Sequence, residues 1–119
     1  MGAIFFVLAN GTLGCDSAHT KISVRNDSSA SLVVESPGGP ELSSQPIKPH
    51  SVVQVSDGSF IGGTFDLVFV DEKSGAILAA RRYDRKNLDR RASNDEIVFE
   101  YPPASGLQEI RNPTRRHRY

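Results

Sequence analysis

The feature that most constrains this chain is the apolar run at residues 64–70, which reads Thr-Phe-Asp-Leu-Val-Phe-Val. Its aromatic and β-branched residues favour a strand. Because side chains alternate along a strand, Phe65, Leu67 and Phe69 share one face, which we expect to be core. The opposite face carries one Asp and two Val residues, so we expect another layer or a loop to cover part of it. The run therefore predicts an interior strand around which the fold is built.

Other alternating runs recur at intervals of roughly ten residues and are separated by turn residues. The expected strands, besides residues 64–70 and a return strand after residue 75, are residues 21–25, 31–35, 51–55 and 96–101. The turn residues between the first two predict a hairpin. This rhythm predicts an all-β fold, a small antiparallel β-sandwich of six or seven strands. Its architecture resembles that of immunoglobulin-like or transthyretin-like sandwiches.

Residues 71–75 predict a hairpin loop that ends in a glycine. If Phe69 faces Ile77 across this hairpin, Asp66 comes within diagonal reach of Arg82. We therefore interpret Asp66 as a structural ion-pair partner and not as a catalytic acid.

Two later segments contain few apolar residues that could contribute to a hydrophobic core. Residues 81–91 are strongly charged, and only Leu88 among them is a good apolar anchor. Asp84 is a suitable helix cap, but we expect a mobile or edge-covering loop. Residues 102–119 are rich in Pro, Gly and Arg, which predicts a flexible basic tail, largely disordered. The expected domain therefore spans residues 21–101.

The amino terminus has the organisation of an export signal. Residues 3–9 form an apolar block, and Thr12-Leu13-Gly14-Cys15 follows shortly after it. This tetrapeptide resembles the lipobox of bacterial lipoproteins, in which the small residue before Cys is the cleavage point and the Cys thiol is acylated. The resemblance implies a signal peptide at residues 1–14, a lipid anchor on Cys15 and a tether at residues 15–20.

Two other interpretations of the amino terminus stay open. A plain cleaved signal would leave no anchor, and in a cytoplasmic protein residues 4–8 would be a first strand, with Cys15 a buried small apolar residue. Cys15 is the only cysteine of the 119-residue chain, so an internal disulfide is excluded.

The carboxy-terminal half is basic although the whole chain has a formal net charge of zero. Its cationic clusters could neutralise phosphates of nucleic acid, lipopolysaccharide or anionic lipid. The alternative is an ordinary solvated loop and tail. The candidate polyanion-binding residues are Arg81, Arg82, Arg85, Lys86, Arg90, Arg91, Arg115, Arg116 and Arg118.

No pattern predicts a metal site, a cofactor or catalysis. His19, His50, His117 and Cys15 are the candidate metal ligands, and only His19 and Cys15 are close in sequence. We therefore expect an exported, lipid-anchored, non-enzymatic binding or structural module of the cell envelope. Its expected partners are the membrane, through Cys15, and an envelope protein or anionic surface. The alternative is a cytoplasmic protein that binds nucleic acid through its basic half.

Overall fold

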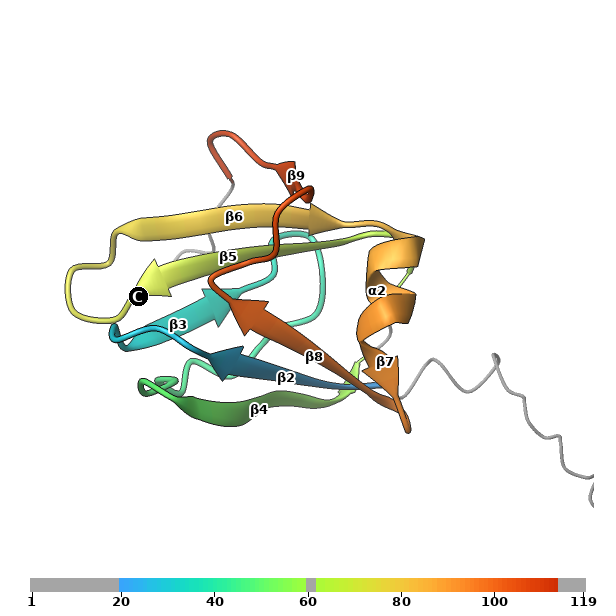
Figure 1. Ribbon diagram of the computed structural model, residues 1–119, viewed down its shortest axis with the longest axis horizontal. Helices are drawn as coiled ribbons and strands as arrows, with labels where there is room; N and C mark the ends of the chain where they lie inside the picture. Colours follow the sequence, from blue (N-terminus) through green and yellow to red (C-terminus); the bar gives the residue numbers. More distant parts are fainter. Residues whose placement is uncertain (1–19, 60–61, 114–119) are drawn as a thin grey trace, which may run out of the picture.

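Two four-stranded sheets and one short helix make up residues 20–59 and 62–113, the parts of the chain that the computed structural model describes (Figure 1). The first sheet has the order β4-β2-β8-β7, formed by Ser51–Ser59, Thr20–Asn26, Glu96–Tyr101 and Ala92–Ser93. The second has the order β3-β5-β6-β9, formed by Leu32–Glu35, Phe65–Asp71, Ile77–Tyr83 and Gln108–Glu109. Helix α2 spans Arg85–Arg91. The expectation of a broadly all-β chain is confirmed.

The core lies where side chains of the two sheets meet. Phe65 of β5 stacks on Phe99 of β8 with ring centroids 5.2 Å apart, and Phe69 of β5 meets Tyr101 of β8 at 5.0 Å. Leu67 lies between Phe65 and Phe69 in sequence. It is fully buried and belongs to the same hydrophobic cluster as these two residues. The expected core face of the central strand is therefore confirmed.

The opposite face of β5 is buried as well. Val68, Val70 and Ala80 form a second apolar cluster, against which Val33 and Ile110 pack. The main-chain amide of Ile110 donates to the carbonyl of Ala80 at 3.0 Å, which fixes this segment beside β6. The last part of the chain thus helps to cover the outer face of the sheet.

The prediction of a flexible tail from residue 102 is wrong for residues 102–113. Gln108 and Glu109 form β9 and pair with Arg82 and Arg81 of β6. The physical reason is that β6 would otherwise present an open edge beside an apolar face. Residues 114–119 lie outside the described residues.

The predicted hairpin between the first two strands is also wrong, because the chain crosses from one sheet to the other between them. Strand β2 pairs antiparallel with β4 and parallel with β8, whereas β3 pairs antiparallel with β5. The first sheet is therefore mixed, not wholly antiparallel. Strand β4 also continues to Ser59, beyond the expected residues 51–55.

The crossing is held by the side chain of Asn26, which has no exposed surface. Its amide nitrogen donates to the carbonyl of Ala30 at 2.6 Å and to that of Ile47 at 3.0 Å. Its amide oxygen accepts from both the main-chain nitrogen and the hydroxyl of Ser28, at 2.9 and 2.7 Å. One side chain thus joins the turn at residues 28–30 to the segment that contains Ile47, which a two-strand hairpin would not bring together.

Strands β5 and β6 form the expected hairpin with a different register. Phe69 faces Ala79 instead of Ile77, because an irregularity in the ladder follows Phe69. Beyond it Asp66 lies directly opposite Arg82, so this predicted pair is confirmed.

Residues 85–91 form helix α2, so the prediction of a loop there is wrong. The Asp84 carboxylate accepts from the main-chain nitrogen of Asn87 at 2.9 Å and caps the helix. Leu88 is fully buried in the main core. A cap and one deeply buried anchor suffice because tertiary packing, not intrinsic propensity, supplies most helix stability in proteins.

Replacing Asn26 with Ala should lower the free energy of unfolding by about 2–4 kcal/mol, because a fully buried amide and its four hydrogen bonds to Ala30, Ile47 and Ser28 would be lost. Denaturant titration of both proteins measures this difference.

Asp27→Ala is the matched control, since it removes an ion pair with Arg25 in which both side chains are 50% exposed. Its expected cost is about 0–1 kcal/mol. Equal losses in the two variants would contradict the role assigned to Asn26.

Candidate basic surface around helix α2

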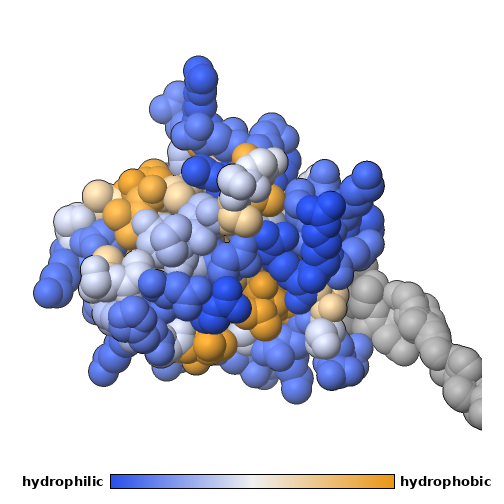
Figure 2. Space-filling view, viewed as in Figure 1, coloured by the Kyte–Doolittle hydropathy of each residue, from blue (hydrophilic) through white to orange (hydrophobic). Residues whose placement is uncertain are grey.

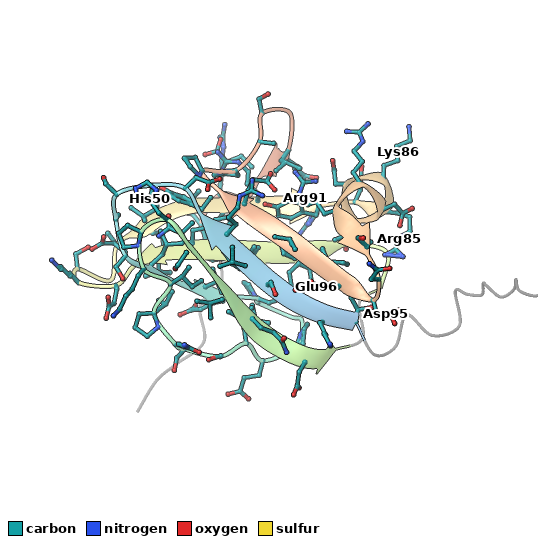
Figure 3. The ribbon with its side chains drawn as sticks, turned by 60° about the horizontal axis from the view of Figure 1, so that its bottom comes forward. His50, Arg85, Lys86, Arg91, Asp95 and Glu96 are labelled. Carbon is teal, nitrogen blue, oxygen red and sulfur yellow. The ribbon has the colours of Figure 1, made fainter. Side chains whose placement is uncertain are left out.

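Helix α2 lies at the end of the molecule where β2 begins (Figures 1 and 3). The Lys21 main-chain nitrogen donates to the carbonyl of Asp95, in the turn between β7 and β8, at 2.8 Å. At the same end Arg85 donates to the carbonyl of Gly62, just before β5, at 3.1 Å. The first described residue, Thr20, therefore lies at the same end of the molecule as α2, the most basic element of the domain.

Arg82, one of the nine candidate polyanion-binding residues, is engaged by a carboxylate on the outer face of the sheet. Its Nε and Nη2 atoms donate to the two Asp66 carboxylate oxygens at 2.7 and 2.8 Å. The hydrogen bond to Asp66 and its charge raise the pKa of Arg82. Because these two donor groups already bind Asp66, the Arg82 guanidinium is not available to pair with an external anion.

Arg91 is engaged more deeply. Its Nε and Nη2 atoms donate to the Glu100 carboxylate at 3.1 and 2.7 Å, and its Nη1 atom donates to the carbonyl of Asn87 at 2.9 Å. The guanidinium also lies over the ring of Tyr83, 5.0 Å from its centroid. Only 13% of the Arg91 side chain is exposed. This contact joins α2 to β6 and β8, and it is structural.

The Arg91–Glu100 pair shifts the ionisation of its members. Burial acts to raise the pKa of Glu100, but the hydrogen bond and the charge of Arg91 outweigh it, so this pKa is lowered. The hydroxyl of the neighbouring Tyr83 finds no hydrogen-bond partner among the described residues, and burial raises its pKa.

Arg85 and Arg81 are partly engaged. Besides its bond to a carbonyl, Arg85 lies 3.8 Å from the carboxylate of Asp89, one helical turn along. Arg81 donates to the carbonyl of Ala80 at 3.0 Å and is half-buried. Both retain charge, but neither side chain is wholly free.

Lys86 and Arg90 differ from the others. Both are exposed, and neither forms an ion pair with any residue in the described part of the chain. Residues four apart on a helix share a face, and Figure 3 shows Lys86 pointing away from the sheets. Of the candidates, Arg115, Arg116, Arg118 and Cys15 lie outside the described residues.

The described residues offer few features that suit a metal site or another kind of binding site. Within residues 20–59 and 62–113, no three His, Cys, Asp or Glu side chains are grouped to hold a metal ion. His50 occupies a turn with φ 59°, and its main-chain nitrogen donates to the carbonyl of Asn26. An open hollow of about 260 Å³ beside β4 is lined by Ser43, Gln54, Val55, Ser56 and Asp57.

No described helix has both the length and the apolar character needed to cross a bilayer. Space-filling colours show apolar groups scattered among hydrophilic ones on the visible face (Figure 2).

Sequence reasoning missed Glu100 as a partner of a candidate residue. The alternation of residues 96–101 correctly placed its neighbours Ile97 and Phe99 in the core, which left Glu100 on the other face. Its pairing with Arg91 requires helix α2, which was not expected. The only signal for Glu100 in the sequence was its position, as an acidic residue, within the alternating run of residues 96–101.

Comparisons with known proteins do not add a relationship: no family model, no curated protein and no solved structure matches this chain.

The Glu100 carboxylate should make stability depend on pH. Because its pKa is lowered on folding, its stabilisation is present above the ordinary carboxyl pKa of about 4.3 and is lost as the pH falls through the lower folded value. In Glu100→Gln the free energy of unfolding should therefore fall less steeply below about pH 5. Urea denaturation at a series of pH values measures both slopes.

Glu41→Gln is the matched control, because Glu41 is exposed. It should keep the wild-type slope. A Glu100→Gln slope indistinguishable from that of wild type would show that Arg91 and Glu100 are not coupled in solution.

Proposed function

We propose that this protein is exported, anchored by a lipid on Cys15, and serves as a non-enzymatic binding or structural module of the cell envelope. The observation that carries the proposal is the distance in sequence between Cys15 and the first strand of the described residues. Strand β2 begins at Thr20, five residues after the Cys of the lipobox-like tetrapeptide. That spacing suits a short connection between an anchor and a domain.

The pairing of β2 supports the same division of the chain. Strand β2 is an interior strand, and its partners β4 and β8 both come from later in the sequence. Both edges of β2 are thus occupied by strands of the described domain. On this proposal residues 1–14 are a signal peptide and the tether runs from Cys15 to Thr20, where β2 begins.

We further propose that the two sheets constitute a β-sandwich of the immunoglobulin-like or transthyretin-like kind. Rigid sheets of this kind carry loops at both ends, and such loops commonly form binding surfaces. The likeness is one of architecture, and it leaves the ligand to be found by experiment.

Two ion pairs weaken the alternative of a cytoplasmic protein that binds nucleic acid. Nucleic-acid binding through the basic half depends on free cations, and the guanidinium groups of Arg82 and Arg91 are both occupied by carboxylates.

Metabolic labelling with a radioactive fatty acid tests the proposal in cells that produce the full chain. We expect label on the wild type, none on Cys15→Ala, and full label on Ser17→Ala, a control substitution two residues away. Unlabelled wild type, or label retained by Cys15→Ala, would contradict the anchor. Recovery in the soluble cytosol with Met1 retained would favour the nucleic-acid alternative.

A further inference from the structure

We propose that the α2 side of the domain contacts an anionic lipid surface through Lys86 and Arg90. This inference rests on the proposed anchor at Cys15 and adds to it an orientation and a chemical partner. It follows from the topology, because the same end of the molecule holds the start of β2 and helix α2 (Figures 1 and 3).

The anchor limits how far this end can move from a membrane. Thr20 lies five positions after Cys15, and even a fully extended chain across those five steps spans at most about 17 Å. Electrostatic attraction between exposed charges decays over about 8 Å at physiological salt. The tether therefore keeps the start of β2 within about two such decay lengths of the bilayer, and turning the α2 side toward the lipid brings its cations into the range in which a charged bilayer acts on them.

Charge is distributed unevenly at this end. Arg85 and Asp89 offset each other at 3.8 Å, so the exposed charge of the helix is carried by Lys86 and Arg90. Asp95, at the turn between β7 and β8, lies on the opposite side of this end from Lys86 (Figure 3). Because Lys21 is hydrogen-bonded to Asp95, the start of β2 lies beside that turn, so among the orientations that the tether allows an anionic surface favours a domain tilted about the start of β2 toward the side that carries Lys86.

The lysines of the chain provide an internal comparison. There are four, at positions 21, 48, 73 and 86. Lys86 is on α2, whereas Lys73 lies in the loop between β5 and β6, at the far end of the molecule (Figure 1). Lys48 precedes β4, whose first residue pairs with Asn26 at the same far end. A reagent that acylates exposed amines therefore reports both ends of one molecule.

The experiment couples the full chain, through its only thiol at Cys15, to maleimide-bearing vesicles. One set contains phosphatidylcholine alone, and the other also contains about 30 mol% phosphatidylglycerol. The rate of acylation of each lysine is measured by mass spectrometry. Because the attachment is chemical, the result does not depend on whether cells acylate Cys15. Failure of the proposed anchor and failure of this inference are thus distinguishable.

On the anionic vesicles we expect Lys86 to react at least about threefold more slowly than on neutral ones, with recovery in about 0.5 M NaCl. Lys48 and Lys73 should react at the same rates on both. Equal rates at Lys86 on both vesicles, or equal slowing of all three lysines, would overturn the proposal.

A pair of matched variants tests the role of the neighbouring cation. Arg90→Glu should remove most of the protection of Lys86, because it replaces the other free cation of the helix with an anion. Lys73→Glu makes the same change of charge at the far end and should leave the protection intact. Equal effects of the two substitutions would show that only the net charge matters, and would overturn the assignment to α2.

Discussion

The apolar residues of strand β5 have almost no contact with solvent on either face, and the rest of the fold serves to cover them. Leu67, Val68 and Phe69 are fully buried, and Val70 is 2% exposed. Each such side chain contributes about 1.5–3 kcal/mol when removed from water. One face is covered by the sheet that contains β2 and β8. The other is covered in part by Val33 and by the returning carboxy-terminal segment, which explains why residues 102–113 are ordered.

Local periodicity was sufficient to predict the longer strands but not β7 or β9, because the alternation of apolar and polar residues reflects which face each side chain occupies. Periodicity was insufficient to predict which strands pair with one another. The crossing between β2 and β3 depends on the Asn26 amide, which reaches Ile47, a residue 21 positions away. No local pattern reports such a contact. Helix α2 was missed for a similar reason, since its single apolar residue, Leu88, gains its stabilisation only inside the assembled core.

The sequence was sufficient to identify the basic residues of the candidate site. It was insufficient to predict which of them form ion pairs and which face solvent. The pair between Asp66 and Arg82 followed from the hairpin, because both residues lie on adjacent strands. The pair between Arg91 and Glu100 did not, since it joins an unexpected helix to a strand. Structure thus separates cations that hold the domain together from Lys86 and Arg90, which face solvent. Helix α2 lies at the same end of the molecule as the start of β2, and this gives both residues a proposed role that depends on Cys15.

The central claim is that the mature protein begins at Cys15 and carries lipid there. Mass spectrometry of the amino-terminal peptide, from protein isolated from the membranes of cells that produce the full chain, tests it most directly. The account predicts a peptide that starts at Cys15 and is heavier than its sequence by the mass of attached acyl groups. A peptide that retains Met1, or one that starts at Cys15 with the unmodified mass, would contradict it.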